Sequence, residues 1–162
     1  MASILKVDTI QHTNGTEALT IDTSGRIKQP QIPAACFHYQ GGNLAGANII
    51  PLNTQSVLQG GMTMSSNAIT MPVTGLYHIG WYHLNNLSTS YAVIIIRING
   101  EAAGNILLHG NQTQYKPANG NNTFSYNTIA SLSASDTVDF YLSQGQIHGN
   151  ADYNSMHVYL LG

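Results

Sequence analysis

The stretch of sequence that decides the fold runs from residue 68 to residue 84: Ala68-Ile69-Thr70-Met71-Pro72-Val73-Thr74-Gly75-Leu76-Tyr77-His78-Ile79-Gly80-Trp81-Tyr82-His83-Leu84. It begins as a short apolar segment, turns at Pro-Val-Thr-Gly and continues as a longer segment with the chain's one tryptophan. Aromatic and β-branched residues bounded by Pro and Gly favour a strand. In such a strand Tyr77, Ile79 and Trp81 face one way, and the residues between them face the other.

From residue 34 onward the whole pattern is that of an all-β protein. Short apolar segments are separated by turn signals such as Asn99-Gly100, and neither a helical period nor an internal repeat is visible. Many short strands with frequent turns predict a sandwich or a jelly roll. The expected strands are the two halves of residues 68–84 on either side of Pro72, together with residues 35–39, 49–52, 56–58, 91–99, 106–109, 124–132, 137–143 and 153–161.

The composition argues against several classes of partner. The 162 residues suit one domain with a short appendage. Charged residues are 7% of the chain, far below the usual ~25%. The formal net charge is −2 without any cluster of Lys or Arg, so neither a nucleic-acid surface nor a basic membrane helix is expected. No segment approaches the ~20 apolar residues of a membrane span.

Cysteine usage and the N-terminus indicate where the chain is made. The one cysteine, Cys36, stands beside Ala35 and Phe37, which is typical of a small buried hydrophobe rather than a reactive thiol. A lone cysteine forms no intrachain disulfide, so we expect folding in a reducing cytoplasm or without need of disulfides. The N-terminal residues lack the apolar segment of a signal peptide.

Residues 1–33 differ from the rest of the chain. They hold half of the charged residues, and two alternating segments, residues 4–10 and 19–22, flank the hairpin-turn signal Asn14-Gly15. A single hairpin is only marginally stable in water, so its apolar residues need a partner surface. We therefore expect an extended N-terminal β-hairpin arm and linker over residues 1–33, followed by the main domain over residues 34–162.

Four segments of the main domain, in order, resemble the C1q/TNF-like jelly roll. They are Pro72-Val73-Thr74-Gly75-Leu76-Tyr77, Ile95-Ile96-Arg97-Ile98-Asn99-Gly100, Ala130-Ser131-Leu132 with Asp136-Thr137-Val138-Asp139-Phe140, and Met156-His157-Val158-Tyr159-Leu160-Leu161-Gly162. The resemblance implies a ten-stranded sandwich that assembles as a tight homotrimer about a threefold axis. No collagen-like Gly-x-y stalk is present, so complement-type and hormone roles do not carry over.

Residues 1–28 resemble the N-terminal segment of virion proteins of tailed phages, especially cyanophages. In those proteins, short modules similar to residues 4–11 and 19–27 precede fibre or decoration domains. The two resemblances together imply a structural protein of a phage virion. We expect a homotrimeric capsid decoration or cement protein, bound to the major capsid protein on the outer surface of the virion, because the chain is short and shows no shaft, heptads or triple β-helix repeat. The alternative is a tail-fibre tip that recognises a host surface glycan. The expected attachment residues are Ile4, Leu5, Val7, Ile10, Leu19 and Ile21.

Two further groups of residues are candidates for binding. One group is expected in the trimer interface or the core: Tyr77, Ile79, Trp81, Ile94, Ile96, Phe140 and Tyr159. For Trp81 the core is favoured, because it alternates with other apolar residues. The other is a polar loop over residues 112–122, whose amides and aromatic ring suit either a glycan or an ordinary solvated loop: Gln114, Tyr115, Asn119 and Asn121.

Catalysis and metal binding are not expected. His78 and His83 lie an odd number of residues apart on one strand and so face opposite ways. No His-x-His or His-x-x-x-His spacing occurs, so no zinc site and no cofactor are predicted. Asp136 and Asp139 read as a turn residue and an outward strand residue rather than an acid–base pair. Neither a Gly-x-Ser-x-Gly motif nor a phosphate-binding loop is present, so we expect no enzyme.

Overall fold

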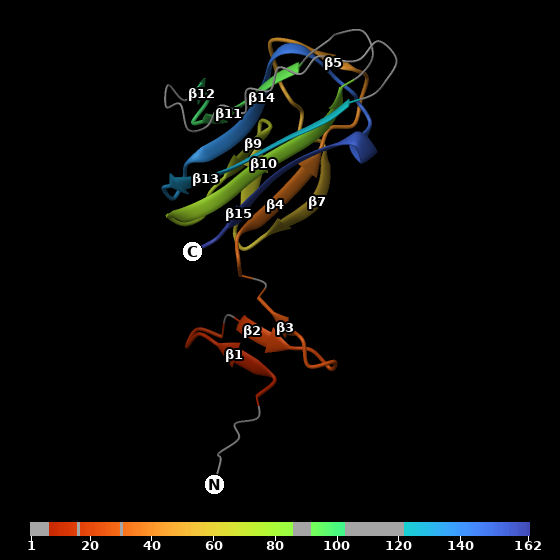
Figure 1. Ribbon diagram of the computed structural model, residues 1–162. Helices are drawn as coiled ribbons and strands as arrows, with labels where there is room; N and C mark the ends of the chain where they lie inside the picture. The colour runs from red at the N-terminus through yellow and green to blue at the C-terminus, as the bar shows by residue number, and fades with distance from the viewer. Residues whose placement is uncertain (1–6, 16, 30, 86–91, 103–121) are drawn as a thin grey trace. The chain divides into compact units, whose positions relative to one another are not determined.

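The computed structural model describes residues 7–15, 17–29, 31–85, 92–102 and 122–162 (Figure 1). The chain divides into two compact units, Met1–Ile32 and Pro33–Gly162. Both are built from β-strands. Among the described residues there is no helix with the length and apolar character needed to cross a membrane.

The N-terminal unit is a three-stranded antiparallel sheet in the order β1 (Thr9–Gln11), β2 (Glu17–Ile21) and β3 (Ile27–Lys28). The expected turn at Asn14-Gly15 is confirmed, since the Gly15 N–H donates to the His12 carbonyl over 2.8 Å. Gly15 has φ +85°, a conformation that glycine adopts without strain. The arm is therefore a three-stranded sheet and not the simple hairpin expected from the sequence, because β3 was not expected.

A carboxylate at the second turn explains the third strand. Asp22 accepts hydrogen bonds from the backbone N–H groups of Arg26 (3.0 Å) and Ser24 (2.9 Å), and the Arg26 side chain donates to its second oxygen over 2.8 Å. The backbone hydrogen bond from Arg26 is the main reason that the pKa of Asp22 lies below its ordinary value. This turn reverses the chain, so Ile27 pairs with Ile21.

The second unit is a sandwich of two antiparallel sheets (Figure 1). One sheet has the order β13-β10-β15-β4-β7. We call it the five-stranded sheet. Its strands are β4 (Ala34–His38), β7 (Thr54–Gln59), β10 (Gly75–Asn85), β13 (Asn122–Leu132) and β15 (Asn154–Leu160).

The second sheet has the order β12-β11-β14-β9-β8, and two short strands, β5 and β6, also pair with β14. The all-β jelly-roll architecture expected from the sequence is thereby confirmed. The bounds are β5 (Leu44–Ala45), β6 (Asn48–Ile49), β8 (Thr63–Ser65), β9 (Ala68–Thr70), β11 (Ala92–Ile98), β12 (Glu101–Ala102) and β14 (Thr137–Ile147).

The core fills the space between the two sheets. Tyr77, Ile79 and Trp81 of β10 point into it with at most 1% of each side chain exposed. The predicted alternation along β10 is therefore confirmed. From the other sheet Phe140 and Ile96 pack against the same cluster. Burial of this apolar surface is the main force that holds the two sheets together.

The strand expected over residues 49–52 differs in the structure. The strand ends at Ile49: the Ile50 N–H still donates to the Phe140 carbonyl of β14, but the Leu52 N–H donates to the Asn67 side chain instead of to a neighbouring strand. Both apolar side chains are still buried. The strand expected over residues 106–109 lies outside the described residues. Strand β8 was missed because its sequence, Thr63-Met64-Ser65, is mostly polar.

Candidate functional site

The outward face of the five-stranded sheet is the main candidate surface. Its five strands contain no Asp, Glu, Lys or Arg, whereas about 25–35% of a typical soluble surface is charged. The other sheet does carry charge, at Arg97 and Asp139. A broad sheet face without any formal charge is typical of a surface that another protein covers.

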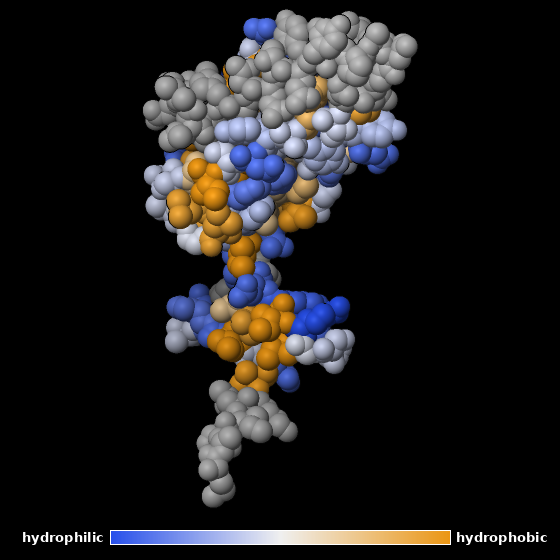
Figure 2. Space-filling model, viewed as in Figure 1, coloured by the Kyte–Doolittle hydropathy of each residue, from blue (hydrophilic) through white to orange (hydrophobic). Residues whose placement is uncertain are grey.

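Four apolar side chains gather at one end of this face. Leu76 of β10 lies beside Leu161, whose N–H donates to the Leu76 carbonyl over 2.7 Å, and Ile129 and Tyr159 flank His78 on the neighbouring strands. We call these four residues the apolar patch. Leu76 and Leu161 are each 50% exposed, Ile129 is 59% exposed and Tyr159 is 39% exposed. Figure 2 shows apolar residues gathered at the end of the jelly roll where β10 begins and the chain ends.

Two histidines stack beside the apolar patch. The rings of His78 and His157 are nearly parallel, with 5.3 Å between their centroids, and His78 also stacks on Tyr159 at 4.6 Å. Gly80 leaves the space, because a Cβ there would overlap Asn127 and His157. Burial, and secondarily the charge of His78, lower the pKa of His157. The lowered pKa favours the neutral form of the His157 ring in this stack.

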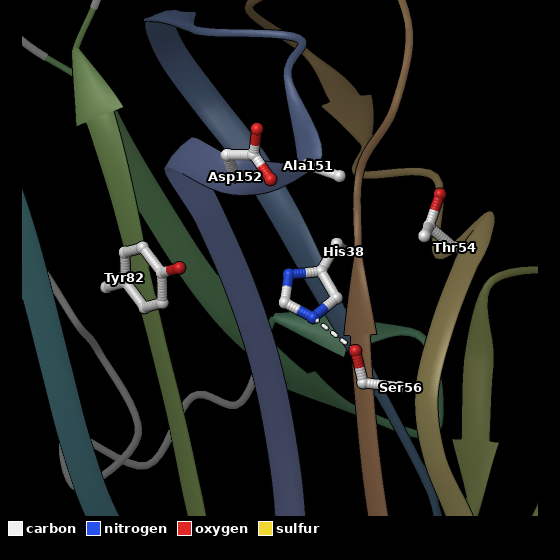
Figure 3. A pocket seen from close by; sticks show the side chains of 6 residues that line it. All are labelled: His38, Thr54, Ser56, Tyr82, Ala151 and Asp152. Carbon is white, nitrogen blue, oxygen red and sulfur yellow. Dashed lines mark hydrogen bonds between the residues drawn. The ribbon is translucent and has the colours of Figure 1, made fainter.

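A polar pocket lies at the other end of the same face (Figure 3). Its cavity is about 420 Å³. Six residues of β4, β7, β10 and the 3-10 turn η2 (Ala151–Tyr153) line it: His38, Thr54, Ser56, Tyr82, Ala151 and Asp152. Tyr82 is six residues from Leu76 along β10, which places the pocket roughly 20 Å from Leu76 at ~3.3 Å per residue. Ile129 and Tyr159 are nearer, because they flank His78, four residues or roughly 13 Å from Tyr82.

His38 is held in one orientation at the centre of the pocket. Its Nδ1 lies 2.6 Å from the Asn154 carbonyl oxygen, which can only accept, so this nitrogen carries the hydrogen. The Nε2 of the neutral ring therefore accepts the hydroxyl hydrogen of Ser56 over 2.7 Å (Figure 3). Asn154 itself is fully buried and bonds Tyr39 through both ends of its amide. The imidazole is thus fixed from the core.

The turn that carries Asp152 is also fixed. Asn150 accepts the Asp152 N–H over 3.0 Å, and Gln40 accepts the Ala151 N–H over 2.9 Å. Gly149 is needed before this turn, because a Cβ would overlap the backbone of Gly41 and Gly42. Within the described chain, the Asp152 carboxylate and the Tyr82 hydroxyl have no hydrogen-bond partner. Both groups are therefore available to a ligand.

The attachment residues expected from the sequence fall on the N-terminal sheet. Ile4 and Leu5 lie outside the described residues, and Val7 is half-buried. Cross-strand pairing places Ile10, Leu19 and Ile21 on one face, together with Ile27. Ile10 and Ile27 are 51% and 64% exposed. We call these four residues the apolar face of the N-terminal sheet. Ile27 was missed because β3 was not expected.

The residues expected in the trimer interface or the core divide sharply. Six of them have at most 1% of the side chain exposed and pack inside one subunit, so they present nothing to a neighbour: Tyr77, Ile79, Trp81, Ile94, Ile96 and Phe140. Tyr159 is the member on the outward face. The expected ligand loop, with Gln114, Tyr115, Asn119 and Asn121, lies outside the described residues. Sequence reasoning missed the pocket of His38 and Asp152.

Comparison with known proteins identifies the fold. No family model matches the chain, and no curated protein matches it. Among solved structures 220 chains match. One is the structure of Eiger TNF from S. frugiperda, with a TM-score of 0.62 over 82% of this chain and 94% of that chain, at 14% sequence identity. The second unit therefore has a TNF-like jelly-roll fold, as the resemblance of its four segments implied.

Proposed function

We propose that this protein is a structural component of a tailed-phage virion. In this proposal the jelly roll forms a homotrimer, and the N-terminal sheet attaches the trimer to the outer surface of the capsid as a decoration or cement protein. The role is mechanical rather than catalytic. The observation that carries the proposal is the charge-free outward face of the five-stranded sheet.

We infer the trimer from two features of that face: its strands carry no charged residue, and it exposes apolar side chains. Leu76, Ile129 and Leu161 are each at least half exposed in one subunit, and covering them against a second copy removes apolar surface from water. The resemblance to C1q/TNF-like jelly rolls implies assembly about a threefold axis. An obligate interface of this kind buries on the order of 2,000 Å² or more.

Attachment is assigned to the apolar face of the N-terminal sheet. The described residues of the N-terminal unit form one three-stranded layer, which leaves Ile10 and Ile27 exposed. Such a face is stabilised when it packs against another protein, and its edge strands can extend a neighbouring sheet. The major capsid protein is the proposed partner, and the assignment to a virion rests on the resemblance of residues 1–28 to tailed-phage proteins.

Deletion of residues 1–32 tests the division of labour. We expect the remaining chain to fold and trimerise, and to lose binding to particles that lack the protein. The paired substitution Ile10→Asp with Ile27→Asp should have the same effect on binding in the full chain. A truncated protein that still decorates particles fully would contradict the proposed role of the sheet.

Copy number per virion separates decoration from the alternative, a fibre tip that binds a host glycan. Quantitative mass spectrometry of purified particles should find the protein at an abundance near that of the shell protein. A small multiple of three copies would instead indicate the tail-fibre location. Absence from particles would contradict both. The observation that favours the alternative is the polar pocket at the far end of the sheet.

A further inference from the structure

We propose that the pocket around His38 and Asp152 binds one unit of an uncharged saccharide. The proposal deepens the alternative function, recognition of a host glycan, by assigning it a site and a ligand class. It concerns a pocket within one subunit, so it does not depend on whether the protein decorates a capsid.

The place and the size of the pocket suit a small ligand. The apolar patch and the pocket lie toward opposite ends of one sheet face. Along β10, Tyr82 is roughly 20 Å from Leu76 and roughly 13 Å from His78, which Ile129 and Tyr159 flank. The cavity of about 420 Å³ falls within the range of roughly 300–1,000 Å³ for small-molecule sites.

The groups that line the pocket suit a ligand with many hydroxyl groups. The Asp152 carboxylate is an acceptor that can bind two neighbouring hydroxyls in charge-assisted hydrogen bonds. Ser56 gives its hydrogen to His38, so its oxygen accepts. Tyr82 adds an apolar ring with a hydroxyl at its tip, which matches a sugar's mixture of C–H faces and hydroxyl edges.

The same groups argue against other ligand classes. No Lys or Arg is among the described lining residues, so a phosphate, sulfate or acidic sugar would meet only the repulsion of Asp152. His38 is already occupied at both ring nitrogens. Among the described residues no group of three or more His, Cys, Asp or Glu is placed to hold a metal ion. A neutral polyol is what remains.

The fixed geometry lowers the cost of binding. His38 is held by Asn154 and Ser56, and the Asp152 turn is held by Asn150 and Gln40. A site whose groups are already ordered loses little side-chain freedom when the ligand arrives. One such shallow site binds weakly, and three copies in a trimer raise the apparent affinity for a surface glycan through effective concentration.

Saturation-transfer NMR on the full-length protein tests the proposal. The probes are the methyl glycosides of glucose, galactose, mannose and N-acetylglucosamine. We expect transfer to at least one of them, and a loss of affinity of about tenfold or more in Asp152→Asn, since a charge-assisted hydrogen bond contributes about 1.5–3 kcal/mol. Tyr82→Ala should also weaken binding, through loss of the ring contact.

Asp8→Asn is the matched control, because it makes the same chemical change at an exposed residue of the N-terminal unit. It should leave the transfer unchanged. The proposal is overturned if none of the four glycosides receives transfer, or if binding is equal in wild type, Asp152→Asn and Tyr82→Ala. Either result would leave the decoration role untouched, because that role is tested by copy number on particles.

Discussion

The imidazole rings of His78 and His157 stack on the outward face of the five-stranded sheet, with centroids 5.3 Å apart and planes inclined by 7°. The two residues lie on neighbouring strands, and Gly80 between them makes the approach possible. Two neutral rings pack well in this arrangement, whereas two protonated rings would repel each other. The charge-free face therefore contains a pair of groups that acid can charge.

We expect the trimer to dissociate as the pH falls below the ordinary pKa range of histidine. The pKa of His157 is lowered mainly by burial, and covering the face would bury it further, so separated subunits take up protons more readily than the trimer. Acid thus favours separation. The other titratable groups on this face of the neighbouring strands are Tyr159 on β15, Tyr82 on β10, and Cys36 and His38 on β4. Of these, His38 is a further imidazole that acid can charge, and its charge would act in the same direction.

Sedimentation velocity between pH 8 and pH 5 measures this effect. The variant His78→Gln with His157→Gln should remain trimeric at the acid end of that range if it assembles at pH 8. Equal dissociation of wild type and the variant in acid would show that other groups control the assembly.

A second pH effect should appear in the stability of the subunit itself. His83 is buried between Trp81 and Phe124, and burial lowers its pKa to about 4. Below pH ~6.5 His83 binds a proton in the unfolded chain, whereas in the folded chain it stays unprotonated until the pH approaches 4. The free energy of unfolding should therefore fall between pH 7 and pH 4, by about 3 kcal/mol from this residue, and level off below pH 4.

His83→Phe should remove most of that pH dependence. Neither ring nitrogen of His83 has a hydrogen-bond partner among the described residues, so replacing the imidazole by a phenyl ring breaks no hydrogen bond to them. Urea unfolding at a series of pH values measures the difference between the two proteins. If the free energy of unfolding depended on pH as strongly in His83→Phe as in the wild type, the folded protein would bind a proton at His83 as readily as the unfolded chain does.

The ion pair on the second sheet gives a stability prediction that does not involve the interface. Arg97 donates to both oxygens of Asp139 (2.7 and 3.0 Å) and lies 4.5 Å from the centroid of the Tyr141 ring. Asp139→Ala leaves the half-buried guanidinium unpaired and should lower the free energy of unfolding by about 3–5 kcal/mol. The double variant Arg97→Met with Asp139→Leu should lose much less.

Denaturant unfolding of the three proteins measures these differences. If the double variant were as unstable as Asp139→Ala, the loss would come from packing around the two side chains rather than from the unpaired charge. The oligomeric state should be the same in all three, because β11 and β14 lie in the sheet opposite the proposed interface.

The sequence predicts the interior of this protein better than its surfaces. The alternation of Tyr77, Ile79 and Trp81 identifies one face of β10, because a strand has a period of two residues. Alternation alone does not tell which face meets the second sheet and which meets another subunit. The aromatic residues therefore fitted either the core or the interface, and the structure places them in the core.

The pocket could not be predicted because its parts are distant along the chain. His38 and Asn154 are 116 residues apart and meet only through the pairing of β4 with β15. The third strand of the N-terminal sheet depends on the Asp22 side chain at a turn, a local feature that strand periodicity does not register. In both cases a side-chain hydrogen bond, rather than hydrophobic pattern, determines the geometry.

The oligomeric state of Ile129→Asp tests the central claim most directly. Ile129 and Ile10 are both exposed isoleucines, at 59% and 51%, on the apolar patch and on the N-terminal sheet respectively. By sedimentation equilibrium the wild type and Ile10→Asp should have three times the 17.4 kDa mass of one chain, and Ile129→Asp should have the mass of one folded chain. A wild-type monomer, or a trimer that survives Ile129→Asp, would contradict assembly through the charge-free face.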